Sequence, residues 1–197
     1  MVVAIALVSL LVLALSNLDM FSRFHVMSAD RQAAIQYEAS LALDHMFKHV
    51  SMAIGALGDP LNPVIVEYAD KRGFRVKIDT NGNGVRDDDS QDLWIAYRYE
   101  TMSPASAFVN ELRYYPNAGT GASPAGGYES IAKGLINSDF SQLPSSGAWG
   151  FAYFLNPNVH DIEVWIRCRW NPALPRSMEN PEVEMHERIY MPSVSSN

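Results

Sequence analysis

The sequence predicts an α+β fold in which one very long N-terminal helix is followed by an antiparallel β-sheet. Two observations lead to this prediction. Neither proline nor glycine occurs before Gly55, and good helix formers are frequent in this stretch. After Pro63, short segments alternate apolar and polar residues with the period of a strand. We therefore expect a helix over residues 1–58 and, given 197 residues in all, one β-rich head domain over residues 59–197.

The helix is predicted to have two parts. Residues 1–16 read MVVAIALVSLLVLALS, and the uncharged run is apolar on every side. It lacks the basic start of a secretory signal peptide, since no Lys or Arg precedes Arg23. Extended through Phe21, it approaches the length of about 20 residues that spans a membrane. We expect residues 1–28 to serve assembly or membrane insertion, and residues 29–58 to pack on the sheet.

The second part of the helix is predicted to be amphipathic, because apolar residues recur three and four positions apart. Gly58 followed by Pro60 is a common helix end. The apolar stripe expected to face the sheet comprises Ala33, Ala34, Tyr37, Leu41, Met46 or Phe47, and Val50.

Seven segments of the head domain have the alternation or the β-branched and aromatic content of strands. The predicted strands cover residues 64–69, 74–79, 93–100, 111–116, 149–155, 161–170 and 182–192. Residues 117–127 form a loop rich in Gly, Ser and Ala, expected at the surface. Residues 129–140 are read either as a short helix or as an irregular crossing. Glu182 and Glu184 are expected on the solvent face of the last strand.

The composition narrows the function classes. The net charge of -7, without a basic cluster, argues against a dedicated nucleic-acid surface. The single cysteine, Cys168, excludes an internal disulfide, a Cys-x-x-Cys-His haem attachment and a Cys-based zinc site within one chain. We expect it to be a buried strand residue. Because a single cysteine cannot form the Cys-x-x-Cys-His motif, the chain is not expected to carry haem. No phosphate-binding glycine loop and no G-x-S-x-G motif occurs, so the chain is not expected to be an enzyme.

One turn-rich segment fits the beginning of a calcium-binding loop. Residues 79–84 match D-x-[DN]-x-[DN]-G, which places short oxygen ligands at every second position. The alternative is a plain hairpin turn, because Asn and Gly tolerate positive φ. The nearby acidic residues favour a structural Ca²⁺ ion, and the predicted ligands are Asp79, Asn81, Asn83, the Val85 carbonyl, Asp87, Asp89 and Asp92.

Two further clusters have the spacing of a binding site. His45 and His49 lie one helical turn apart and could hold a metal, but a solvated or inter-subunit helix face is favoured. Eight aromatic residues at strand spacing could form a stacking surface for carbohydrate or nucleic acid, although core packing is favoured. They are Tyr97, Tyr99, Tyr114, Tyr115, Trp149, Phe151, Tyr153 and Phe154.

The order of these motifs resembles the type IV pilins and the pseudopilins of type II secretion, in particular their larger minor members. MVVAIALVSLLVLALS is similar to the helix that follows the pilin signature, and ALDHMFKHVSMAIGALG to the end of that helix. IDTNGNGVRDD and LWIAYRYE resemble the acidic turn and the next strand. ELRYYPN resembles a head-domain strand, and DIEVWIRCRW with EVEMHERIYMP resembles the paired C-terminal strands.

The resemblance implies a structural subunit of an extracellular pilus or a periplasmic pseudopilus, with the helices bundled and the heads outside. Its partners would be copies of itself or other pilin-like subunits, the assembly machinery and, before assembly, the inner membrane. The residues expected to mediate filament assembly are Met1, Val2, Ile5, Val8, Leu11, Leu13, Leu15, Leu18 and Phe21.

One feature departs from the family. Mature pilins carry Glu at the fifth position, whereas this chain has Ile5 and no acidic residue before Asp19. We expect about six N-terminal residues of the mature chain, including a Glu that pairs with a neighbour's amine, to be missing from this sequence. The alternative is a subunit that lacks this Glu.

The second function class is a membrane-anchored periplasmic or cell-surface binding module with a calcium-stabilised β domain. A cell-envelope enzyme comes third. The filament is favoured because no flexible Gly/Ser linker separates the apolar and amphipathic parts of the helix.

Overall fold

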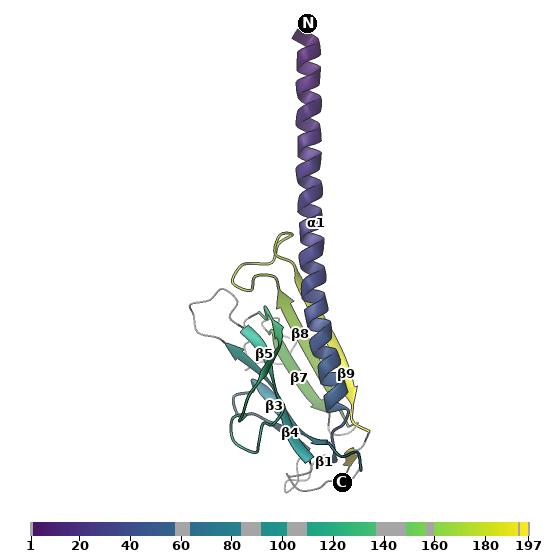
Figure 1. Ribbon diagram of the computed structural model, residues 1–197, viewed down its shortest axis with the longest axis vertical. Coiled ribbons are helices and arrows are strands. Elements are labelled where there is room, and N and C mark those ends of the chain that lie inside the picture. Colours follow the sequence, from purple (N-terminus) through teal and green to yellow (C-terminus); the bar gives the residue numbers. More distant parts are fainter. Residues whose placement is uncertain are drawn as a thin grey trace.

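A computed structural model describes residues 2–57, 64–83, 92–101, 110–136, 149–156, 160–192 and 194–196. It confirms the α+β arrangement: a long N-terminal helix packs against antiparallel sheets (Figure 1). The elements are α1 (Val2–Val50), β1 (Gly55–Leu57), β2 (Ile65–Glu67), β3 (Gly73–Asp79), β4 (Asp92–Thr101), β5 (Asn110–Tyr115), β6 (Glu129–Lys133), β7 (Phe151–Asn156), β8 (Asp161–Arg169), β9 (Glu182–Tyr190) and β10 (Val194–Ser196).

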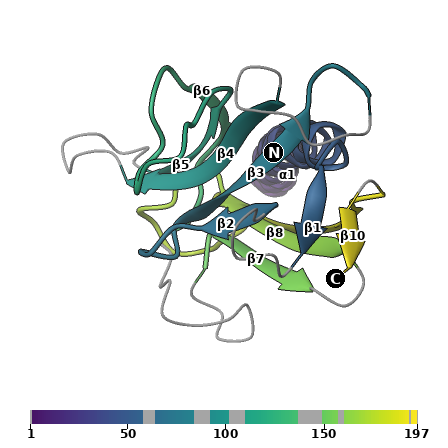
Figure 2. The ribbon, with the colours of Figure 1, turned by 90° about the horizontal axis from the view of Figure 1, so that it is seen from below.

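The strands form three sheets. Five strands pair antiparallel in the order β2-β3-β4-β5-β6, and three more in the order β7-β8-β9. A short parallel pair joins β1 to β10. Seen along the helix axis, the larger sheets lie on different sides of a shared interior that α1 closes (Figure 2).

The interior is one hydrophobic core shared by α1 and both larger sheets. Phe74 on β3 packs against Tyr153 on β7, with ring centroids 5.0 Å apart. The Tyr153 hydroxyl donates a 2.8 Å hydrogen bond to the Gly73 carbonyl. These contacts tie the two larger sheets together, and a smaller buried cluster of Tyr68, Ala96, Tyr115 and Ala118 is separate from the main core.

The face of α1 that packs on the head differs from the predicted stripe. Tyr37 and Leu41 are 71% and 53% exposed, and Ala33, Ala34 and Phe47 are exposed as well. Helical periodicity alone cannot choose between two faces that both carry apolar residues. The alanines of the true face let the helix backbone approach the sheets closely. The buried residues are Ile35, Ala39, Ala42, Leu43, Met46 and Val50, so the stripe is correct only at its last positions.

The helix ends at Val50, before the predicted end near Gly58. The next residues join the edge of the five-stranded sheet: Ile54 N–H donates to the Lys77 carbonyl at 3.1 Å, and Asp79 N–H to the Met52 carbonyl at 3.0 Å. Gly55 then turns with a φ of 128°, which a residue with a side chain rarely adopts. Sheet pairing therefore overrides the helix propensity of this segment.

Residues 129–133 form strand β6, so both readings of this segment, short helix and irregular crossing, are wrong there. Ala132 lies opposite Leu112 of β5, and both are fully buried. The register of the pair shifts at Leu112/Arg113, which obscures the alternation that marks a strand. The loop at residues 117–127 connects β5 to β6 and is mostly exposed, as predicted.

Candidate assembly surface and the junction with the head

The apolar part of α1 projects as a free stalk beyond the head domain (Figure 1). It is the one helix among the described residues that is long and apolar enough to cross a membrane, and its most apolar window is entirely exposed. Met1 and the side chain of Val2 lie outside the described residues. The other predicted assembly residues are 58–67% exposed, and these are Ile5, Val8, Leu11, Leu13, Leu15, Leu18 and Phe21.

The stalk cannot be stable in water on its own. Each large apolar side chain gains roughly 1.5–3 kcal/mol when it is fully buried. The head contributes no cover to this part of the helix, and a contiguous apolar surface of this extent marks a site of protein or membrane contact. Asp19 and Arg23 form an exposed ion pair at 3.0 Å, which marks the end of the uncharged run. The exposed apolar surface is compatible with association with a membrane.

The loop between β8 and β9 fixes the stalk to the head where α1 leaves it. Ser28 Oγ donates to the Met178 carbonyl, and Arg31 Nη1 donates to the Glu179 carbonyl, each at 2.5 Å. The Arg31 guanidinium also lies 5.6 Å from the Trp170 ring centroid. These contacts define the direction in which the stalk leaves the head. The sequence did not predict them, because they join residues about 150 positions apart.

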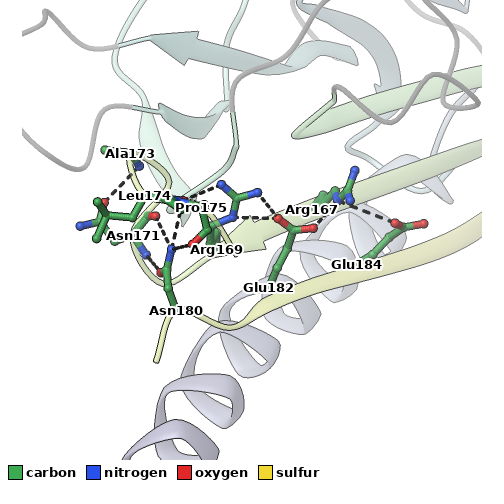
Figure 3. Close-up of polar contacts among 9 residues, drawn as sticks. All are labelled: Arg167, Arg169, Asn171, Ala173, Leu174, Pro175, Asn180, Glu182 and Glu184. Atoms are coloured by element: carbon green, nitrogen blue, oxygen red, sulfur yellow. Dashed lines mark hydrogen bonds and ion pairs between the residues drawn. The ribbon is translucent and has the colours of Figure 1, made fainter. Parts of the chain in front are cut away.

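Asn180 organises this junction loop (Figure 3). Its side-chain Oδ1 accepts a 2.7 Å hydrogen bond from Asn171 N–H. Its Nδ2 group donates to three carbonyls, those of Asn171, Leu174 and Pro175, at 3.0–3.1 Å. Asn180 is 5% exposed, so these bonds are shielded from water. The Asn-Pro pair at 171–172 signals a turn in the sequence, but it cannot identify Asn180 as the residue that closes it.

Glu182 lies on the outward face of β9 that it shares with Glu184, as predicted, but its side chain is not solvated. Its side chain is 4% exposed and is bound by two arginines of β8: Arg167 Nε donates at 2.8 Å to Oε1, and Arg169 Nε at 2.8 Å to Oε2 (Figure 3). Burial acts to raise the pKa of Glu182, but the hydrogen bonds and charges of Arg169 and Arg167 outweigh it and lower the pKa. Glu184 is half exposed, as predicted.

The predicted calcium loop is only partly described. Asp79 lies opposite Asp92 at the base of the β3–β4 hairpin. Asp79 Oδ1 accepts a hydrogen bond from Gly82 N–H at 2.7 Å, and Asn81 Oδ1 accepts one from Asn83 N–H at 2.9 Å. The other predicted ligands lie outside the described residues, and these are Val85, Asp87 and Asp89. A calcium ion here therefore stays a prediction.

The histidine pair lies on a helix face that the head covers in part, and whether a neighbouring subunit contacts that face stays a prediction. Both imidazoles are partly buried, and the Tyr114 ring packs edge-on against His45, with centroids 4.5 Å apart. Burial, together with the charges of His49 and Lys48, lowers the pKa of His45 to about 4. Six of the eight predicted aromatics are buried in the head, which favours core packing, whereas Phe154 is 46% exposed and Tyr153 intermediate.

Cys168 is fully buried in β8, as predicted. Within the described ranges, no group of three or more His, Cys, Asp or Glu side chains is placed to share a metal ion. Comparisons with protein-family models, with curated proteins and with solved structures each find no match.

Proposed function

We propose that this chain is a structural subunit of an extracellular pilus or a periplasmic pseudopilus, assembled through its apolar N-terminal helix with the head on the filament surface. The proposal rests on the difference in burial between the two halves of α1. One face of its C-terminal half is buried against the head, while every described side chain of the predicted assembly set is exposed. One continuous helix thus joins a self-contained head to an uncovered apolar stalk.

The fixed junction supports assembly rather than tethering. A tethered binding domain works best on a flexible linker, which lets it move relative to the membrane. Here α1 runs without interruption from the stalk into the head, and Ser28 and Arg31 bind the junction loop. A rigid connection places the head at a defined angle to its stalk, which is what a helical polymer of identical subunits requires.

In this proposal the stalk resides in the inner membrane and then exchanges lipid for the stalks of neighbouring subunits. Helix packing buries the same apolar side chains that lipid covered. The loop at residues 117–127 lies exposed on the head and contributes to the filament surface. The residues that hold the chain in the membrane and those that build the polymer are therefore the same.

Electron microscopy of sheared cell-surface material, with an antibody to the head, tests the proposal. We expect thin fibres decorated by the antibody. Leu11→Asp places a charge on the stalk and is expected to abolish fibres, whereas Gln36→Asp changes an exposed polar position of the same helix and is expected to preserve them. Labelled chain found in membranes and never in fibres would favour the membrane-anchored binding module instead.

A further inference from the structure

The histidine pair at the end of α1 has features that neither the fold nor filament assembly requires. His45 and His49 stack with ring centroids 4.2 Å apart and a tilt of 31°. Both side chains are partly buried and still reach solvent. Two imidazoles held this close, one helical turn apart, have the spacing at which a helix offers two nitrogen ligands to one metal ion.

Each ring is oriented through its Nδ1 atom. His49 Nδ1 lies 2.8 Å from the His45 carbonyl oxygen, which can only accept, so Nδ1 carries the proton and Nε2 presents a lone pair. His45 Nδ1 lies 3.1 Å from the Tyr97 hydroxyl, which in turn donates to the His45 carbonyl at 3.4 Å. The Tyr97 hydroxyl therefore holds the His45 ring at its Nδ1 edge.

This pattern is the usual support of metal-binding histidines, whose second ring nitrogen donates to a carbonyl or another oxygen. Among the described residues, both rings make their hydrogen bonds through Nδ1. To share an ion about 2.0–2.1 Å from each Nε2, the stacked rings must splay apart from their 31° tilt, so that both in-plane lone pairs converge on it.

We propose that His45 and His49 form a two-histidine site for a divalent transition-metal ion, with water in the remaining coordination positions. Imidazole nitrogen selects Cu²⁺, Ni²⁺ or Zn²⁺ over Ca²⁺ and Mg²⁺, which prefer oxygen. Tyr97 acts as a positioning residue that orients His45, and the Tyr114 ring restricts both imidazoles from the side. The site does not depend on filament assembly.

Isothermal titration of the full chain in non-ionic detergent, without an affinity tag, with CuCl₂, NiCl₂ or ZnCl₂ tests this proposal. We expect one ion per chain, with Cu²⁺ bound most tightly. His49→Gln should weaken binding at least about tenfold, because one imidazole cannot chelate. The His49 side chain bonds within the helix, to the His45 carbonyl, so this variant should keep the fold. His45→Gln should weaken binding equally, and Tyr97→Phe more modestly.

The matched control is His25→Gln, since His25 is an exposed histidine on the same helix without a second histidine one turn away. We expect this variant to bind like the parent chain. The electron paramagnetic resonance spectrum of the Cu²⁺ complex should show two nitrogen ligands, and His49→Gln should reduce them to one. Undiminished binding by His49→Gln, or an equal loss in His25→Gln, would overturn the assignment.

Discussion

Asn180 is the side chain on which the junction between stalk and head depends, and its replacement tests this directly. Asn180→Ala removes one accepted and three donated hydrogen bonds to the backbone of residues 171–175. Each such bond contributes a net 0.5–1.5 kcal/mol, roughly, and the abandoned groups are only partly reached by water. We expect the free energy of unfolding to fall by about 2–3 kcal/mol.

Asn180→Asp sharpens the test because it preserves the shape of the side chain. A carboxylate cannot donate, so it would face three carbonyl oxygens that repel it. We expect it to destabilise the head at pH 7 by at least as much as Asn180→Ala does. If electrostatic repulsion is the cause, lowering the pH should recover part of the loss as the new carboxyl group is protonated.

The control is Asn171→Ala in the same loop, since the Asn171 side chain accepts a single exposed hydrogen bond from Ala173 N–H at 3.1 Å. We expect a loss of about 0.5–1 kcal/mol. The measurement is guanidinium unfolding of the detergent-solubilised chain, followed by tryptophan fluorescence. Equal stability of all three variants would refute the role assigned to Asn180.

Three further predictions follow from buried groups of the head. Glu182→Gln should lower stability at pH 7 by about 1–3 kcal/mol, because two arginines lose their countercharge, whereas Glu184→Gln should change it by less than about 0.5 kcal/mol. Burial raises the pKa of Cys168 to about 12, so thiol reagents should modify the native chain far more slowly than the unfolded chain. Burial also raises the pKa of Glu38, whose Oε1 accepts a 2.6 Å hydrogen bond from Lys133 N–H, so Glu38→Gln should be more stable than the parent chain at pH 7.

The pH dependence of these carboxylates has opposite signs. The folded-state pKa of Glu182 is lowered, so its stabilisation is present above the ordinary value of 4.5 and is lost as the pH falls through the folded-state pKa. The folded-state pKa of Glu38 is raised, so the advantage of Glu38→Gln should shrink as the pH falls towards 4.5. Urea unfolding from about pH 7 down to about pH 3 measures both effects. If the advantage of Glu38→Gln did not change with pH, the raised pKa of Glu38 would not be its cause. Rapid labelling of Cys168 in the native chain would contradict the separate prediction made for that thiol.

The order of the helix and of seven strands was predictable because their signals are local, whereas β1, β6 and β10 were not predicted. The absence of breakers before Gly55 predicts the helix, and period-two alternation predicts strands such as β3 and β8. The packed face of α1 was not predictable in the same way. Ala39 and Tyr37 lie on different faces that both look apolar in the sequence, and only the sheets decide which is covered.

Of the two candidate surfaces, only the stalk was predictable from the sequence. The stalk was predictable because an uncharged apolar run is a property of consecutive residues. The junction and the Glu182 ion pairs were not, because they join residues distant in sequence: Arg31 reaches Glu179, and Glu182 binds Arg167 across a strand pair. Alternation assigned Glu182 to solvent, but long arginine side chains cover that face of the sheet.

Photocrosslinking from the middle of the stalk tests assembly through α1 most directly. A photoreactive amino acid replaces Leu11 in cells that assemble the chain, and mass spectrometry identifies what it captures, with Ser123 on the exposed head loop as the control position. We predict that position 11 captures the apolar stretch of α1 from a second subunit and that position 123 does not. Adducts with lipid alone, from cells examined at full assembly, would contradict an assembly role for the stalk.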